Sequence, residues 1–146
     1  MMSSKYRHVM SDLAGNKVVY NKLVQHNVKF IPMYSGGAIM PLIDNFHSDM
    51  NHGKIITHVN THEQHCGHSA TGYAKSTGHT GVTIVTSGPG VTNMITPLQD
   101  ATSDSTPLIL LSGQVPRSAM GSDAFQECPA VECTTPVTKW SFLIHL

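Results

Sequence analysis

The sequence predicts a doubly wound α/β domain, in which a mainly parallel sheet carries helices on both faces. Strand-like and helix-like segments alternate along the chain, which is typical of βαβ units. The runs VTIVTS at 82–87 and PLILLSG at 107–113 are almost continuously apolar, as strands are when both faces of a parallel sheet are covered.

Residues 1–15 are expected to be a loose lead, and residues 16–146 to form the domain. Asn16 is a suitable N-cap for the first helix. Pro32 lies inside the first apolar run and cannot donate a ladder hydrogen bond, which indicates an edge strand or an irregular strand end. The expected elements of this half are a helix over 17–27, a strand over 28–34, a glycine turn at 35–37, a helix over 38–46 and a polar loop over 48–54.

In the second half, Thr61 is the expected N-cap of a helix that ends near Thr77, and Gly78 and Gly81 bracket its end. The expected elements are a strand over 55–60, this helix, a strand over 82–87, a helix over 91–101 and a strand over 107–113. After Gly113 the chain is expected to be irregular.

The composition of the 146 residues excludes several classes of function. Only 12% of the residues are charged and the formal net charge is zero, so nothing favours nucleic acid or an anionic membrane surface. No apolar run reaches the roughly 18 residues of a membrane span. The three cysteines show no Cys-x-x-Cys pairing and are expected to be reduced thiols. No targeting signal is visible, so a cytoplasmic location is expected.

Polar and glycine-rich segments follow each expected strand: MYSGG, HVNTHEQ, VTSGPG and LLSGQVP. Ligands of open parallel sheets bind outside the carboxyl ends of the strands. The sequence therefore predicts one functional rim, and Glu63 lies on it.

Glu63 stands among His62, His65 and His68, which suggests a zinc-protease motif. That motif needs histidines at i and i+4, but the residue four positions after His62 is Cys66, so surface histidines are the better interpretation. A structural acid that caps the helix is the alternative favoured by spacing alone. A helix N-terminus favours a charged carboxylate, whereas an apolar cleft favours the protonated form.

The segment TSGPGVTN at 86–93 follows a strand and opens a helix, as the dinucleotide fingerprint G-x-G-x-x-G does. Asn93 occupies the third glycine position, and no acid follows about twenty residues later at the end of the next strand. Two interpretations remain open: a cofactor contact at the rim, or a tight turn in which Gly88 and Gly90 give backbone freedom and Pro89 gives stiffness.

Two further residues are potential nucleophiles, Cys66 and Ser87, but neither stands in a G-x-S-x-G elbow. Cys66 is more simply explained as a small buried hydrophobic residue. Phe125 and Trp140 are expected to be packing residues.

Four segments occur in one order: SGGAIMPLID, HEQHCGHSATGYAKSTGHTGVTIVTSGPGVTN, DSTPLILLSGQVP and GSDAFQE. With them, residues 16–146 resemble the amino-terminal, pyrimidine-binding domain of acetolactate synthase, in the thiamine-diphosphate-dependent decarboxylase superfamily. HEQ and SGPG are shared widely in the superfamily. GQVP followed by DAFQE is narrower and resembles the flavin-containing biosynthetic enzymes.

The resemblance implies that Glu63 reaches the aminopyrimidine ring of thiamine diphosphate and shares a proton with it, which activates the cofactor. Further implied contacts are Pro89 and Asn93 with the pyrimidine, Gly36 and Gly37 with the thiazolium entry, Ser105 with FAD, and Arg117, Phe125, Gln126 and Lys139 with the substrate channel. The implied reaction converts two pyruvates, small 2-keto acids, to 2-acetolactate and CO2 in branched-chain amino acid biosynthesis.

The chain departs from the resembled family at three positions: Ser35, Thr61 and Thr71 stand where Pro, Arg and Glu are common. Family chains are also several times longer. Their middle, FAD-holding domain and their diphosphate-binding domain, which holds Mg2+, have no counterpart in these residues. The resemblance thus implies half a site, which a homodimer or a chain carrying the diphosphate-binding domain would complete, and an isolated chain that is inactive.

Two alternatives remain open: a non-catalytic remnant or interaction module, and a domain of another 2-keto acid decarboxylase or carboligase. The chain is also expected to self-associate, because its net charge is zero. The resemblance places the helix with the HEQ motif at a subunit interface. Its expected contact residues are Cys66, Gly67, Ala70, Tyr73 and Ala74.

Overall fold

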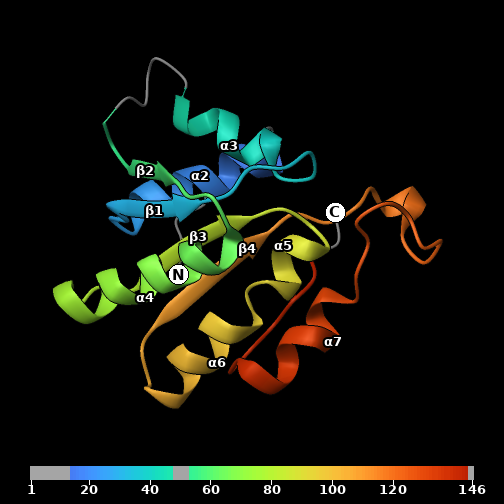
Figure 1. Cartoon of the computed structure of the whole chain (residues 1–146). Helices are drawn as coiled ribbons and strands as arrows, with labels where there is room; N and C mark the ends of the chain where they lie inside the picture. Colours follow the sequence, from blue (N-terminus) through green and yellow to red (C-terminus); the bar gives the residue numbers. More distant parts are fainter. Residues whose placement is uncertain (1–13, 48–52, 145–146) are drawn as a thin grey trace, which may run out of the picture.

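The computed structural model describes residues 14–47 and 53–144, and its centre is a four-stranded parallel sheet (Figure 1). The strand order is β2-β1-β3-β4. The strands are β1 at Phe30–Met33, β2 at Ile56–Val59, β3 at Gly81–Val85 and β4 at Leu108–Ser112. β1 pairs with β2, and β3 with β4, along their whole lengths.

Helices cover both faces of this sheet, so the expected doubly wound α/β class is confirmed (Figure 1). The longer helices are α2 at Gly15–Gln25, α3 at Met40–His47, α4 at Glu63–Thr77 and α6 at Ile95–Ser103. The short ones are α5 at Pro89–Thr92, η2 at Arg117–Ala119, α7 at Ala130–Thr134 and η3 at Thr135–Val137. α2 and α3 pack on the face that carries Ile31 and Ile84, and α4 and α6 lie on the opposite face.

Two apolar clusters result from this layering. The larger one joins α2 and α3 to the sheet, with Tyr20 and Phe46 in edge-to-face contact at 5.1 Å between ring centroids. The smaller one joins β3 and α6 through Val85, Met94 and Leu98. Over 14–47 and 53–144, no helix has the length and apolar character needed to cross a membrane.

The structure corrects both predicted helix caps. The first helix begins at Gly15, with Ala14 at the cap position, and Asn16 instead donates its side-chain amide to the Pro41 carbonyl at 2.6 Å. α4 is capped by His62 rather than Thr61, because the Nδ1 of His62 accepts the amide hydrogen of Gln64 at 3.1 Å. Spacing alone cannot tell which of two adjacent polar residues turns its side chain towards the helix.

Of the two alternatives predicted for Pro32, an edge strand or an irregular strand end, the edge strand is wrong. Pro32 lies in β1, between β2 and β3, and is fully buried. The pairing of β1 with β3 consists of the single pair Met33 and Ile84, so proline has few ladder bonds to interrupt there. The Thr83 hydroxyl also donates to the Pro32 carbonyl at 2.9 Å and adds a side-chain link between these strands.

The single helix expected over 91–101 is divided into α5 and α6, with a break at Asn93 and Met94. The cause is Pro97, which has no amide hydrogen to donate to the carbonyl four residues earlier and whose ring would clash with that carbonyl in a continuous helix. After Gly113 the chain is irregular as expected, apart from short helical turns. The expected lead at 1–15 and polar loop at 48–54 fall mostly outside the described residues.

The apolar side of α4 faces the chain's own core rather than a partner. Cys66, Ala70 and Ala74 are 0%, 0% and 4% exposed, because they pack towards the sheet. Tyr73 is half-buried and contacts the Phe30 ring. Cys66, Ala70 and Ala74 are therefore not available for the subunit interface that was expected of them.

Candidate functional site

The loops at the carboxyl ends of β1, β3 and β4 meet, as the rim prediction required. A Cβ on Gly36 would lie 2.4 Å from the Cβ and Oγ1 of Thr86, so the turn after β1 lies directly on the residue that follows β3. A Cβ on Gly113 would lie 2.8 Å from Ala38. Only glycine permits both approaches, and this explains the glycines after β1 and β4.

The turn after β3 is built on Gly88, which has φ 55° and ψ −112°. A Cβ there would meet the Gln126 carbonyl oxygen at 2.5 Å. The Cys128 thiol also lies 3.7 Å from the Gly88 carbonyl. The DAFQE segment is thereby brought onto the SGPG turn, about forty residues away in sequence. Pro89 follows as the first residue of α5 and is exposed.

Glu63 is the first residue of α4 and is only 7% exposed. Its Oε2 accepts a hydrogen bond of 2.9 Å from the side-chain amide of Asn93. Among the described residues, no hydrogen-bond partner faces its other oxygen, Oε1. The N-terminus of α4 stabilises negative charge at this position. The arrangement is a buried acid with one oxygen held and the other available to a ligand.

Asn93 distinguishes the SGPGVTN motif from the dinucleotide fingerprint. It stands where a dinucleotide fingerprint has its third glycine, and its side chain is committed to Glu63. The motif therefore serves to place an amide against the acid, and the dinucleotide interpretation has no support.

Sequence reasoning missed two buried polar groups at the rim. The Thr86 hydroxyl and the Asn60 side-chain nitrogen are the buried side-chain atoms without a hydrogen-bond partner in the described part of the chain. Thr86 follows β3 and Asn60 follows β2. The Asn60 side chain interacts with the Cys66 thiol, so the Thr86 hydroxyl is the group whose missing partner indicates a polar ligand at the rim. Their position directly after a strand was the available sequence signal.

The remaining predicted residues are dispersed. Gln126 lies at the rim against Gly88, whereas Phe125 is 88% exposed and Lys139 is also exposed. Arg117 is exposed in η2. Ser105, in the turn before β4, lies at the amino end of that strand and hence at the edge of the sheet opposite Glu63. Gly37 is open, since a Cβ there would have no atom within 4 Å.

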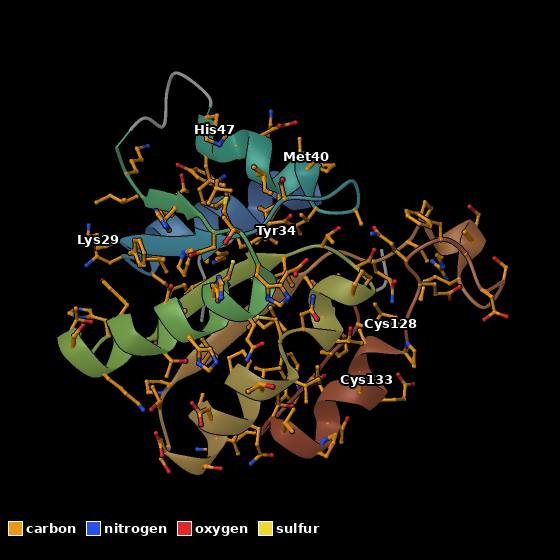
Figure 2. The ribbon with its side chains drawn as sticks, viewed as in Figure 1. Lys29, Tyr34, Met40, His47, Cys128 and Cys133 are labelled. Atoms are coloured by element: carbon orange, nitrogen blue, oxygen red, sulfur yellow. The ribbon has the colours of Figure 1, made fainter. Side chains whose placement is uncertain are left out.

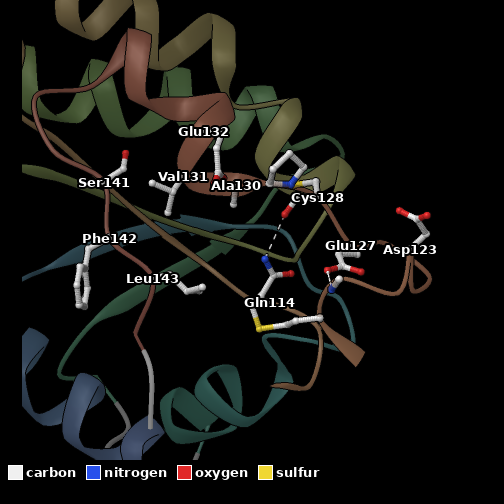
Figure 3. Close-up of a pocket in the computed structure, with 13 residues that line it drawn as sticks. Gln114, Asp123, Glu127, Cys128, Ala130, Val131, Glu132, Ser141, Phe142 and Leu143 are labelled. Atoms are coloured by element: carbon white, nitrogen blue, oxygen red, sulfur yellow. Dashed lines mark hydrogen bonds between the residues drawn. The ribbon is translucent and has the colours of Figure 1, made fainter. Parts of the chain in front are cut away.

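A cavity of about 550 Å³ lies between the segment after β4 and α7 (Figure 3). Gln114 crosses it to donate to the Cys128 carbonyl at 3.2 Å, and Phe142 forms part of its wall. Neither Glu63 nor the predicted substrate-channel residues line this cavity. It adjoins the rim through Gln114 and Cys128 but does not include the acid.

The metal-site and nucleophile interpretations considered from the sequence lack the geometry that each requires. Among residues 14–47 and 53–144, no three His, Cys, Asp or Glu side chains are grouped as a metal site requires. Burial raises the pKa of the Cys66 thiol to about 11, which opposes nucleophilic chemistry there. Ser87 is 2% exposed. Cys128 and Cys133, both free thiols, lie on the α7 side of the molecule (Figure 2).

A buried acid at a helix N-terminus, on the carboxyl rim of a parallel sheet and beside glycine turns, defines an α/β cofactor-binding domain. Residues 13–133 match the family described as "Thiamine pyrophosphate enzyme, N-terminal TPP binding domain". The chain belongs to this family of thiamine diphosphate-binding domains.

Individual relatives are acetolactate synthases. Acetolactate synthase isozyme 3 large subunit of Escherichia coli is 45% identical over 135 residues, which is 92% of this chain and 23% of that protein. The mitochondrial acetolactate synthase of Schizosaccharomyces pombe is 42% identical over 140 residues, 96% of this chain and 20% of that protein. The mitochondrial acetolactate synthase catalytic subunit of Aspergillus candidus is 43% identical over 130 residues, which is 89% of this chain and 18% of that protein. The chain spans about a fifth of the length of these relatives.

Proposed function

We propose that this chain supplies the aminopyrimidine half of a thiamine diphosphate site in an acetolactate synthase, which converts two pyruvates to 2-acetolactate and CO2. The observation that carries the proposal is the buried Glu63 carboxyl held by Asn93 at 2.9 Å. Identity above 40% to three acetolactate synthases supports the substrate class.

The residues of the rim fit the aminopyrimidine. The unpartnered Thr86 hydroxyl lies against the Gly36 turn, and both follow strands whose carboxyl ends share an edge of the sheet with Glu63. A heteroaromatic ring with nitrogen donors and acceptors would satisfy such groups, whereas a purely apolar ligand would leave them unpaired. Thiamine diphosphate, when bound, supplies the nucleophilic carbon and the electron sink for decarboxylation.

The chain's own residues would hold and move one proton. Because Oε2 of Glu63 already accepts a hydrogen from Asn93, a proton on this carboxyl resides on Oε1, the oxygen free to face a ligand. Glu63 can then donate that proton from a fixed position and take it back.

The finer parts of the proposal rest on the resemblance. We propose that Mg2+ and the diphosphate are bound by a diphosphate-binding domain outside these 146 residues, and that a homodimer or a chain carrying that domain completes the site. FAD is proposed to contact Ser105, which is exposed at the edge of the sheet opposite Glu63. The cytoplasmic location stays a prediction.

Complementation tests the function. The chain is combined with a polypeptide that carries the diphosphate-binding domain, and 2-acetolactate formation from pyruvate is measured with thiamine diphosphate and Mg2+. Glu63→Gln should lower the rate by roughly two to four decades, since an amide holds the hydrogen bond but cannot donate the proton. Glu132→Gln, at an exposed acid on α7, is the matched control and should retain the parent rate.

Two results would contradict the proposal. A Glu63→Gln rate within a few-fold of the parent would remove Glu63 from proton transfer, and the non-catalytic module would then be the better account. Turnover by the 146-residue chain alone would refute the half-site.

A further inference from the structure

Helices α4 and α6 touch one helical turn beyond the bond between Glu63 and Asn93. Gly67 is four residues after Glu63, and Pro97 is four residues after Asn93. Asn93 and Met94 keep right-handed helical backbone angles, so Asn93 and Pro97 lie about one turn apart. A Cβ on Gly67 would lie 2.4 Å from the Cγ of Pro97 and 2.5 Å from its Cβ. The two helices therefore meet at two successive levels.

We propose that Gly67 and Pro97 are positioning residues that set the distance between the Glu63 carboxyl and the Asn93 amide. The catalytic consequence rests on the proposed function, whereas the geometric relation does not. The contact involves the α4 backbone on one side and a rigid ring on the other, so neither partner can yield by rotating a flexible side chain.

The amount of movement that one methyl group would force is large on the scale of a hydrogen bond. Carbon atoms in contact sit about 3.5–4.0 Å apart, so a Cβ at 2.4 Å requires the helices to separate by about 1 Å. Added to the 2.9 Å bond, this takes the two atoms past the range of about 2.7–3.2 Å in which such bonds form.

A glycine inside α4 is otherwise unfavourable. Alanine stabilises a helix interior relative to glycine, and Gly67 is followed by ten further residues of the same helix. Gly67 is buried, and its carbonyl accepts the Thr71 hydroxyl at 2.9 Å. Close approach of Pro97 is the feature that explains the glycine.

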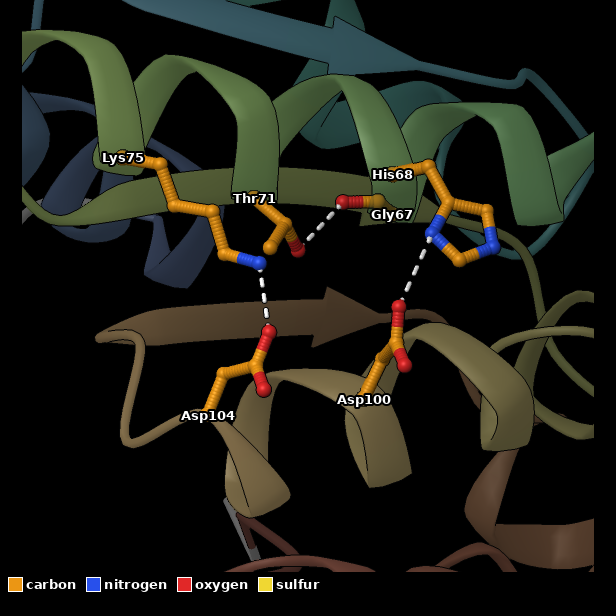
Figure 4. A network of polar contacts seen from close by, with 6 residues as sticks. All are labelled: Gly67, His68, Thr71, Lys75, Asp100 and Asp104. Atoms are coloured by element: carbon orange, nitrogen blue, oxygen red, sulfur yellow. Dashed lines mark hydrogen bonds and ion pairs between the residues drawn. The ribbon is translucent and has the colours of Figure 1, made fainter.

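The other side-chain links between these helices are too loose to set their spacing (Figure 4). Lys75 pairs with Asp104 at 2.5 Å, and His68 lies 3.9 Å from Asp100. All four side chains are between 41% and 60% exposed, and solvent-exposed ion pairs of this kind contribute little to stability. These flexible side chains would rotate to accommodate a shift of about 1 Å between the helices and would not resist it.

The test compares crystal structures of five versions of the full chain: the parent, Gly67→Ala, Pro97→Gly, the double variant and Gly72→Ala. Gly72 is the matched control, because it is exposed on the same helix and a Cβ there has no atom within 4 Å. We expect the Glu63–Asn93 distance to exceed about 3.5 Å in Gly67→Ala, because the added methyl group forces the helices apart. We expect it to differ from the parent value in Pro97→Gly, because the ring no longer limits how closely the helices approach. The double variant, in which the new methyl fills the space of the lost ring, should restore it.

A Glu63–Asn93 bond that keeps its parent length in a folded Gly67→Ala or Pro97→Gly would overturn the inference. If Gly67→Ala does not fold, Pro97→Gly and the double variant still decide. Pro97→Gly adds no atom, and in the double variant the new Cβ lies 2.8 Å from the Met94 Cε, the end of a flexible side chain that can move. A changed Glu63–Asn93 distance in Gly72→Ala would also contradict the inference. A substitution elsewhere on α4 would then alter the bond, and the contact with Pro97 would not be its cause.

The kinetic arm uses the complemented enzyme. Gly67→Ala should lower kcat on the order of a hundredfold, the scale of a 1 Å misplacement, with little change in KM for pyruvate, and the double variant should recover most of it. A bond that lengthens as expected while kcat stays at the parent value would overturn the catalytic role of the contact. If Glu63→Gln is then also fully active, the proposed function has failed and the geometric relation stands.

Discussion

The side-chain amide of Asn93 donates a hydrogen bond of 2.9 Å to the carboxylate of Glu63, which lies thirty residues earlier in the sequence. The two residues come from the ends of different helices, α4 and α5, and meet only because the strands before these helices, β2 and β3, run parallel in one sheet. A relation of this kind makes the rim sensitive to small changes in the loops and helices that carry it.

Gly36 gives the first test of the rim. A methyl group at Gly36 would clash with Thr86 at 2.4 Å, whereas the same group at Gly37 would meet no atom within 4 Å. Gly36→Ala should therefore lower the free energy of unfolding by about 1–3 kcal/mol, the usual cost of overpacking. Gly37→Ala should change it by less than about 0.5 kcal/mol. Urea denaturation of both variants measures the difference, and equal stabilities would show that the loop after β1 does not rest on Thr86.

Gly88 combines backbone strain with a clash. It has φ 55°, and a Cβ there would lie 2.5 Å from the Gln126 carbonyl. Gly121 also has positive φ, at 80°, but has free space around it. Gly88→Ala should consequently destabilise the chain by clearly more than the roughly 1 kcal/mol expected of Gly121→Ala. Thermal unfolding of both variants tests this, and a larger effect at Gly121 would separate the DAFQE segment from the SGPG turn.

The buried thiol of Cys66 leads us to expect a loss of stability at alkaline pH. Burial raises the pKa of its thiol from 9.0 to about 11, so the folded chain favours the protonated form. The stabilisation is complete below pH 9 and is lost as the pH rises from 9 towards 11. Cys66→Ala should show a smaller fall in unfolding free energy over this window than the parent, and the difference should be roughly 2–3 kcal/mol. Parallel curves for the two proteins would contradict a buried neutral thiol.

Exposed aromatic residues near the end of the described chain predict association. Trp140 and Phe142 are 76% and 62% exposed and stack at 5.5 Å between ring centroids. With zero net charge, little repulsion keeps such surfaces apart. Analytical ultracentrifugation should show dimers or larger species, and Trp140→Ser with Phe142→Ser should shift the distribution towards monomer. A monomer up to about millimolar concentration would exclude any association stronger than roughly 4 kcal/mol.

The sequence by itself determined the fold class and the identity of the acid. Continuous apolar runs such as VTIVTS report strands buried on both faces, and strand–turn–helix alternation implies parallel order. The glycine stop of α4 at Gly78 was also local information, since its φ of 74° suits glycine best. Glu63 could be singled out because its position between a strand and a helix follows from the residues immediately before and after it.

Only the tertiary structure decided which residues accompany that acid. Pro32 proved to be interior because the pairing of β1 with β3 is short, and Cys66 and Ala70 proved to be core because the sheet, not a partner, covers that side of α4. Likewise, the sequence does not show that the Thr86 hydroxyl lacks a hydrogen-bond partner or that Pro97 packs closely against Gly67. Propensity and periodicity describe a residue's neighbours along the chain, whereas hydrogen-bond partners and close contacts depend on where separate elements pack in space.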